Sequence, residues 1–223
     1  MILNLKFELN KPIIDIEYRK MFISYFKYCL NDVDEKYFKQ YYDNTDKKTF
    51  TFGCYLQGIH PTKNNDMFEL DSNIISLNIS FDDKLQGYLF YSCFLRQRDK
   101  LFNIKHNQMK LIEVKEVCEK SINGNCVIIK TLSPICLLDH EKGKHDQYYT
   151  IDDEKFFDKF KEKTGIEIQL LDSRKVVVQH YGISVPCSVG KFILIGDQNK
   201  LMKFYRSGIG NKTGQGFGMI DFI

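Results

Sequence analysis

The sequence lacks any long hydrophobic run. No stretch approaches the roughly 18 consecutive apolar residues that span a bilayer, and the first residues, MILNLKFELN, contain no apolar segment followed by a small-residue cleavage site. We therefore expect a cytoplasmic protein with no membrane partner. Apolar residues still make up 43% of the chain, with 18 Phe and 13 Tyr, a composition that favours a globular protein over a disordered one.

Paired cysteines are also missing. Seven cysteines occur at positions 29, 54, 93, 118, 126, 136 and 187, and no two form a Cys-x-x-Cys pair. This odd, scattered set argues against a disulfide framework and a zinc ribbon, and is typical of buried, reduced thiols. Cys136, His140 and His145 are close in sequence, but no fourth ligand follows at a recognisable spacing. We therefore expect no metal site and no cofactor.

The chain carries little net charge. The excess of +3 indicates no class of partner by itself, but its distribution is uneven. Residues 191–212 contain the single acid Asp197 and five basic residues, namely Lys191, Lys200, Lys203, Arg206 and Lys212. This local cationic region favours an anionic partner.

The first half predicts the element order β-α-β-β-α-β, which is the ferredoxin-like arrangement. GIHPTKNND (residues 58–66) is expected to be a loop, and Asp32 is expected to cap a second short helix after a break near Asn31. The predicted strands occupy residues 2–9, 47–56, 74–81 and 109–117. The predicted helices cover residues 16–42 and the residues after Asp82 or Asp83, where Leu85, Tyr88, Leu89 and Ser92 share a face.

The second half repeats this order. Its predicted strands are 126–132, 166–171, 175–181, 191–195 and 217–223, with a hairpin turn at Asp172-Ser173. One helix follows Asp152 or Asp153, places Phe156, Phe157 and Phe160 inward and ends at Gly165, and a second runs from Asp197 through Tyr205. The prediction is an α+β protein with tandem ferredoxin-like (RRM-like) domains, residues 1–118 and 125–223.

The segment SGIGNKTGQGFG (residues 207–218) concentrates glycine. A dinucleotide fingerprint requires G-x-G-x-x-G before a helix, whereas three residues separate Gly210 from Gly214 and a strand follows. A P-loop requires glycine before its lysine, where this chain has Asn211. A mobile loop with glycines at turns remains open. The alternative is an open loop against which a phosphodiester backbone lies, and its RNA-binding residues would be Arg206, Gly208, Gly210, Lys212, Gly214, Gly216 and Gly218.

Three stretches carry a resemblance to a known family. Residues 190–222, GKFILIGDQNKLMKFYRSGIGNKTGQGFGMIDF, are similar to the strand, helix and terminal glycine-rich loop of CRISPR-associated endoribonucleases of the RAMP superfamily. IIKTLSPICL (residues 128–137) and KTFTF (residues 48–52) also resemble that family. The resemblance implies two ferredoxin-like units packed side by side and a metal-independent cut of precursor CRISPR RNA within its repeats. The 2′-hydroxyl would attack the adjacent phosphate, giving a 2′,3′-cyclic phosphate and a 5′-hydroxyl end.

The sequence departs from that family's pattern in its expected catalytic residues. Family members commonly place a histidine about six residues before the lysine that aligns with Lys48; here that position holds Tyr42, and the first 59 residues contain no histidine. Tyr28, Tyr41, Tyr42, Lys47 and Lys48 are the alternative catalytic set, in which a lysine stabilises the phosphorane and a tyrosine orients the 2′-hydroxyl. Each also has a structural interpretation, with the tyrosines packing on the core and the lysines solvated.

The five histidines are weaker candidates. His60 is expected at the far end of the second strand, and His106, His140, His145 and His180 are expected to be surface or strand residues.

The favoured function is therefore a repeat-specific endoribonuclease with CRISPR repeat RNA as its partner. The alternative is a protein of weak or absent activity that retains this RNA in an effector complex. An ordinary metabolic enzyme of the same fold would need a pocket that the sequence does not reveal. Assembly with other effector subunits, or as a homodimer, stays open.

Overall fold

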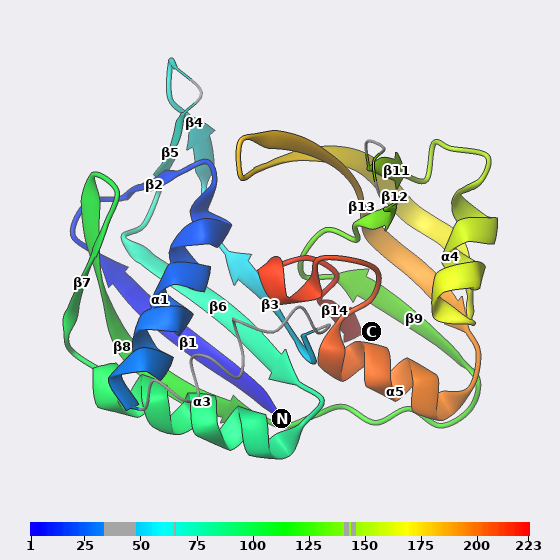
Figure 1. Cartoon of the computed structure of the whole chain (residues 1–223), viewed down its shortest axis with the longest axis horizontal. Helices are drawn as coiled ribbons and strands as arrows, with labels where there is room; N and C mark the ends of the chain where they lie inside the picture. Colours follow the sequence, from blue (N-terminus) through cyan, green and yellow to red (C-terminus); the bar gives the residue numbers. More distant parts are fainter. Residues whose placement is uncertain (34–47, 65, 141–142, 144–145) are drawn as a thin grey trace.

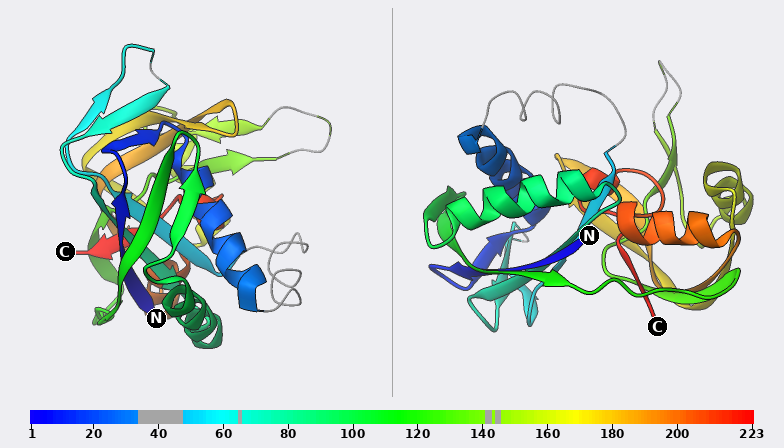
Figure 2. Two further views of the ribbon diagram at one scale, coloured as in Figure 1. Left: turned by 90° about the vertical axis from the view of Figure 1, so that its left-hand side faces the viewer. Right: turned by 90° about the horizontal axis from the view of Figure 1, so that it is seen from below.

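Two units lie side by side, each built on an antiparallel sheet (Figure 1). The computed structural model describes residues 1–33, 48–64, 66–140, 143 and 146–223. In both units the helices cover one side of the sheets, as the view from below shows (Figure 2). The predicted α+β class with tandem ferredoxin-like units is confirmed, and none of the described helices is long and apolar enough to cross a membrane.

The N-terminal unit extends from β1 to β8. Its elements are β1 (Ile2–Leu9), β2 (Ile13–Asp15), α1 (Tyr18–Val33), β3 (Phe50–Tyr55), β4 (Ile59–Pro61), β5 (Met67–Leu70), β6 (Ile74–Phe81), α3 (Lys84–Gln97), β7 (Leu101–Ile104) and β8 (Asn107–Val117). The main sheet has the order β3-β6-β1-β8-β7, and β2, β5 and β4 form a small second sheet. The four expected strands therefore take the ferredoxin-like order 2-3-1-4, with β7 added at the edge.

The C-terminal unit repeats this arrangement. Its elements are β9 (Cys126–Thr131), β10 (Leu137–Asp139), β11 (Gln147–Tyr149), α4 (Phe156–Thr164), β12 (Glu167–His180), β13 (Ile183–Ile195), α5 (Gln198–Ser207), the 3₁₀ turn η1 (Thr213–Gln215) and β14 (Ile220–Phe222). The sheet order β12-β13-β9-β14 is again 2-3-1-4.

Aromatic side chains fill the core of the N-terminal unit. Phe26 of α1 packs edge-on against Phe52 of β3, with ring centroids 5.3 Å apart, and lies 5.7 Å from Phe94 of α3. All three side chains are at most 1% exposed. Burying one such ring contributes about 1.5–3 kcal/mol. This cluster fixes α1 and α3 on the sheet and thereby positions the start of α1, which contacts the C-terminal unit.

Three helix ends agree with the sequence. Asp83 accepts a hydrogen bond from the backbone N–H of Leu85 (2.9 Å), Asp197 accepts one from Lys200 (3.1 Å), and Gly165 ends α4 at φ +67°. The start of α4 differs, because its N-cap is Lys155 and makes no side-chain cap bond.

The inward face predicted for α4 was partly wrong, and the face that Leu85 and Tyr88 share in α3 is not its buried face. Leu85 and Tyr88 are 79% and 53% exposed, whereas Phe90 and Phe94 of α3 are buried in the aromatic core. In α4, Phe157 is 41% exposed, whereas its neighbours Phe156 and Phe160 are fully buried. A helix with apolar side chains on several faces offers more than one consistent inward stripe, and packing selects one of them.

The turn predicted at Asp172-Ser173 was wrong. Residues 167–180 form one strand, whose pairing with β13 shifts between Leu170 and Asp172. The hairpin turn comes later, at Tyr181-Gly182, where both residues have positive φ, as a two-residue turn matching the strand twist requires. The long hairpin that results brings its tip to the N-terminal unit.

Several short elements also differ from the prediction. Within GIHPTKNND, residues 59–61 form β4, which pairs with β5, so this segment is not only a loop. Asp32 accepts a hydrogen bond from Gln97 of α3 (2.6 Å). The expected second helix after Asp32 lies outside the described residues.

Candidate functional site between the two units

The glycine-rich segment (residues 208–218, with η1 at its centre) lies between the two units (Figure 1). On the C-terminal side, the backbone N–H of Asn211 donates to the carbonyl of Cys136 (2.7 Å), and that of Gly218 donates to Pro134 (2.8 Å). The Ser-Pro stretch of the sequence thus supports the segment from one side.

The N-terminal unit holds the same segment from the other side. Thr51 of β3 donates from Oγ1 to the carbonyl of Phe217 (2.8 Å), and Arg19 of α1 donates from Nε to the carbonyl of Gly216 (3.0 Å). Arg19 is only 7% exposed, and its guanidinium lies 5.2 Å from the ring centroid of Phe217 and 4.8 Å from that of Tyr18. A buried charge is stabilised by such contacts. The segment is therefore clamped between the units.

Most of the glycines meet protein atoms at close range. At Gly216, φ is +86° and an added Cβ would lie 2.7 Å from the buried ring of Phe52. The other glycines with positive φ have equally close neighbours; they are Gly208, Gly210 and Gly218. At these positions the rest of the chain fills the space that a Cβ would need, so glycine is required there by packing, and the role of these glycines in RNA binding stays a prediction.

Gly214 brings the two predicted sets of site residues together. A Cβ at this position would lie 2.7 Å from both Cβ and Cγ of Lys48. The candidate catalytic lysine therefore packs against η1, although the sequence places the two in different units. The other candidates from this region, Tyr41, Tyr42 and Lys47, lie outside the described residues.

A histidine also reaches the segment. His180, the last residue of β12, has its Nε2 3.0 Å from Oε1 of Gln215 in η1, and it is 1% exposed. Burial lowers the pKa of His180, the hydrogen bond with Gln215 opposes that shift, and the charges of Arg19 and Lys212 lower the pKa further. Burial therefore favours the neutral form of the ring. Its Nδ1 is buried without a hydrogen-bond partner in the described part of the chain.

The remaining candidates are less central. Tyr28 is 41% exposed and packs on Phe102 of β7, with ring centroids 5.2 Å apart. Since Tyr28 lies nine residues after Arg19, the helical rise places it about 13 Å further along α1. The Nε of Arg206 lies 2.9 Å from a carboxylate oxygen of Glu119, in the connection between the units.

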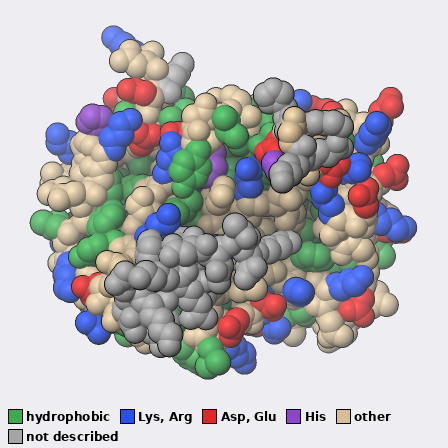
Figure 3. All heavy atoms as spheres, in the orientation of Figure 1, with side chains coloured by type: hydrophobic (Ala, Val, Ile, Leu, Met, Phe, Trp, Pro, Cys, Tyr) green, Lys and Arg blue, Asp and Glu red, His purple; other side chains and the backbone are tan. Residues whose placement is uncertain are grey.

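Lys212 is the N-cap residue that precedes η1, and its φ is +58°. A hydrogen bond from His140 lowers the pKa of Asp146, and the charge of Lys212 adds to this shift. Lys212 therefore lies close enough to the β10–β11 hairpin to influence it. On the face that carries the segment, Lys and Arg side chains are spread over both units and do not gather in one patch (Figure 3). An anion bound between the units would therefore be held by a few local cations, with Lys212 on the segment and Lys48 packed against it.

Sequence reasoning missed Arg19, Thr51 and His180 as partners of the segment. Thr51 stood inside the noted motif KTFTF, and Arg19 is a basic residue at the start of an otherwise apolar helix face. His180 gave no comparable signal, because it ends an ordinary alternating strand.

The C-terminal unit matches a known protein family. Residues 116–222 match the model described as CRISPR associated protein Cas6, C-terminal. Among curated proteins, nothing matches this sequence.

Solved structures resemble the whole chain. A structure described as an RAMP protein binding different RNA substrates is 20% identical, with a TM-score of 0.82 over 100% of this chain and 99% of the other. A Cas6-related protein from Pyrococcus furiosus is 21% identical, with a TM-score of 0.84 over 100% and 98%. A Cas6 product complex is 15% identical, with a TM-score of 0.73 over 100% and 99%. At these identities the likeness shows a shared two-unit fold.

Proposed function

We propose that this chain is a CRISPR-associated endoribonuclease of the RAMP type that cuts precursor CRISPR RNA within its repeats. The match of its C-terminal half to the Cas6 model supports this proposal, as do folds shared with a protein described as binding different RNA substrates and with a Cas6 product complex. We place the boundary between its two domains in residues 118–125. Association with other effector subunits or with a second copy is not required by the proposed reaction.

One observation carries the proposal. Lys48 packs against Gly214 of the glycine-rich segment. The candidate catalytic lysine therefore lies next to the proposed binding site for the RNA backbone. A phosphate resting on η1 would lie within reach of the ammonium groups of Lys48 and Lys212, both on flexible stems. Gly214 differs from the other glycines of the segment in having no positive φ, so its requirement for glycine comes from close packing with Lys48.

The proposed reaction needs no metal ion. The 2′-oxygen attacks the adjacent phosphorus, the bond from phosphorus to the 5′-oxygen breaks, and the products carry a 2′,3′-cyclic phosphate and a 5′-hydroxyl. A base takes the proton of the 2′-hydroxyl, and an acid supplies one to the leaving 5′-oxygen. We propose that Lys48 stabilises the negative charge of the pentavalent phosphorus. Tyr41 or Tyr42 would orient the 2′-hydroxyl, with Lys47 as a second cation.

The first experiment asks whether the RNA is cut. The purified protein is incubated in EDTA with a labelled repeat RNA and, separately, with the same RNA carrying a 2′-deoxy nucleotide at the cut site. Cleavage of the first RNA alone supports the proposal, because only that RNA has the attacking hydroxyl. Binding of both RNAs without any cut would favour the alternative of an RNA-retaining protein. If the protein neither binds nor cuts the repeat RNA, both the endoribonuclease and the RNA-retaining alternative are refuted.

The second experiment tests Lys48. Lys48→Met keeps the aliphatic contact with Gly214 but removes the charge. We expect the single-turnover cleavage rate to fall roughly 10²- to 10³-fold, as when one transition-state donor is removed, with a much smaller loss in RNA affinity. Lys100→Met, at an exposed lysine in the turn after α3, is the matched control and should change neither value. An equal loss of rate and affinity would assign Lys48 to binding alone.

A further inference from the structure

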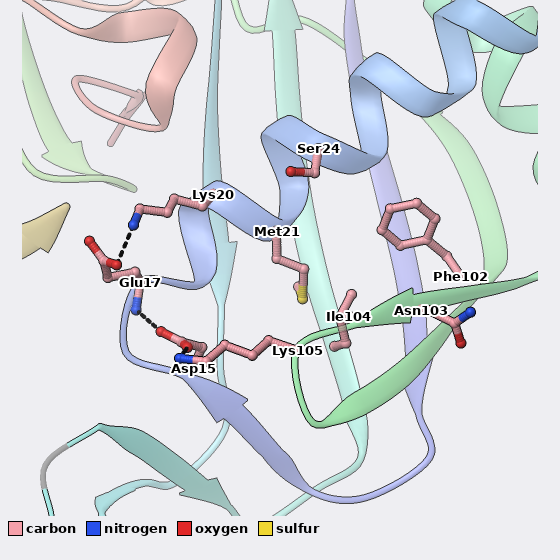
Figure 4. Close-up of a pocket in the computed structure, with 9 residues that line it drawn as sticks. All are labelled: Asp15, Glu17, Lys20, Met21, Ser24, Phe102, Asn103, Ile104 and Lys105. Carbon is pink, nitrogen blue, oxygen red and sulfur yellow. Dashed lines mark hydrogen bonds and ion pairs between the residues drawn. The ribbon is translucent and has the colours of Figure 1, made fainter. Parts of the chain in front are cut away.

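A cleft of about 310 Å³ opens between α1 and the β7–β8 hairpin, outside the glycine-rich segment (Figure 4). Met21 of α1 and Ile104 of β7 point into it from opposite sides, and Phe102 closes one end (Figure 4). Ser24, an exposed residue of α1, stands at the opening. The volume is at the lower end of the range of pockets that hold small ligands, about 300–1,000 Å³.

The rim of the cleft is charged but balanced. Asp15 pairs with Lys105 at 2.9 Å, and Glu17 pairs with Lys20 (Figure 4). The two carboxylates thus neutralise the two ammonium groups, so the cleft offers neither a net positive site for a phosphate nor a net negative site for a cation. Its apolar interior and neutral rim suit a flat, uncharged and largely apolar group.

The rim connects the cleft to the site between the units. The backbone N–H of Gly182, at the tip of the β12–β13 hairpin, donates to Glu17 (2.7 Å). The ammonium of Lys20 lies 4.9 Å from the ring centroid of Tyr181. One residue earlier in α1, Arg19 holds the glycine-rich segment. A single-stranded RNA that lies on the glycine-rich segment can therefore reach the cleft by crossing the tip of the β12–β13 hairpin.

Tyr181 presents an exposed aromatic side chain beside this contact. Its φ of +52° is the conformation that the two-residue hairpin turn requires, and the residue is 54% exposed. Its ring packs edge-on against the buried His180, with ring centroids 4.5 Å apart, and contacts Lys20 of the cleft rim. These contacts hold the ring beside the mouth of the cleft.

We propose that the cleft receives one unpaired nucleobase of the bound RNA, with Tyr181 as a stacking surface at its mouth. This inference rests on the proposed function. Single-stranded RNA is commonly recognised by splaying out bases, which then stack on aromatic side chains or enter pockets. A base is flat, neutral and partly apolar, which matches the interior formed by Met21, Phe102 and Ile104. The backbone of the same RNA would lie on the glycine-rich segment.

The test blocks the cleft and removes the base. Ser24→Phe places a large side chain at the opening from an exposed helix position, and Ser92→Phe, at an exposed position of α3, is the matched control. We expect Ser24→Phe to weaken binding of the repeat RNA roughly 5- to 150-fold, the loss typical when stacking of one base is removed. Ser92→Phe should leave the dissociation constant unchanged.

Single abasic substitutions along the repeat RNA identify the base. At one position the abasic RNA should bind wild type with the same loss, and it should bind wild type and Ser24→Phe equally well, because the pocketed base is already absent. If no abasic position weakens binding to wild type more than twofold, the inference is overturned. This arm needs no variant, so it stays decisive even if Ser24→Phe does not fold. If wild type neither binds nor cuts the intact repeat, the proposed function itself has failed.

Discussion

Replacing Gly216 with alanine tests whether the glycine-rich segment is clamped as the structure shows. The alanine would have to keep φ at +86° and would place its Cβ 2.7 Å from the ring of Phe52, which is 1% exposed and cannot move aside freely. The left-handed conformation costs about 1–2 kcal/mol, and overpacking a filled core costs about 1–3 kcal/mol. Gly216→Ala should therefore destabilise the fold by about 2–5 kcal/mol.

Gly182→Ala supplies the matched control. Gly182 has φ +76°, but nothing lies within 4 Å of an added Cβ, so only the backbone cost of about 1–2 kcal/mol applies. The free energy of unfolding is measured by urea titration, followed by far-UV circular dichroism and by tyrosine fluorescence to check that both report one transition. If Gly216→Ala costs no more than Gly182→Ala, the ring of Phe52 does not confine the segment and the description of the clamp is wrong.

Two further predictions concern buried side chains of the C-terminal unit. Burial lowers the pKa of His180 below its ordinary value of 6.5, so the unfolded chain binds this proton more readily and stability should decrease as the pH falls below about 6.5. His180→Gln should flatten the dependence of the urea midpoint on pH between 7 and 5, and an unchanged slope would contradict the assignment. Phe160→Ala should cost about 3–5 kcal/mol and Phe157→Ala about 1 kcal/mol or less, because the first is buried and the second is 41% exposed. Equal losses of unfolding free energy would show that α4 packs differently.

Much of the fold followed from local patterns. Alternating apolar residues located β1 and β6 with their observed ends, and the element order of each half predicted its ferredoxin-like sheet. Asp83, Asp197 and Gly165 were identified as helix ends because capping depends on side chains and backbone within one helical turn. These features depend on neighbours in sequence, so the sequence suffices for them.

The register of the β12–β13 hairpin did not follow from local patterns. Asp172-Ser173 has turn-forming residues, but both residues pair with β13 within a ladder of thirteen pairs, whose register shifts just before them, between Leu170 and Asp172. Tyr181-Gly182 became the turn because Gly182 accepts positive φ and the tip gains contacts with α1. Competing turns of similar local preference are decided by the contacts that each one permits elsewhere.

The candidate site also has features that the sequence reveals and features that only tertiary contacts create. Its glycine-rich segment and Lys48 were recognisable as residue types, since glycine concentration and a basic residue before an alternating strand are visible in one dimension. The packing of Lys48 on Gly214 and the contacts of Arg19 and Thr51 with the segment join residues more than a hundred positions apart, and the contact of His180 with Gln215 joins residues 35 positions apart. The local pattern of apolar and polar residues does not predict such contacts between distant parts of the chain.

The amino-acid sequence alone therefore specified two similar units, their helix ends and a cationic, glycine-rich stretch near residue 210. Which atoms fill the space beside each glycine depended on how the two units pack, because a missing Cβ has the same meaning in sequence whether a ligand or a buried ring occupies its place. The tertiary structure assigned Gly216 to Phe52 and Gly214 to Lys48. It thereby restricted the proposed site for the RNA backbone from the whole glycine-rich segment to the side of η1 on which Lys48 lies.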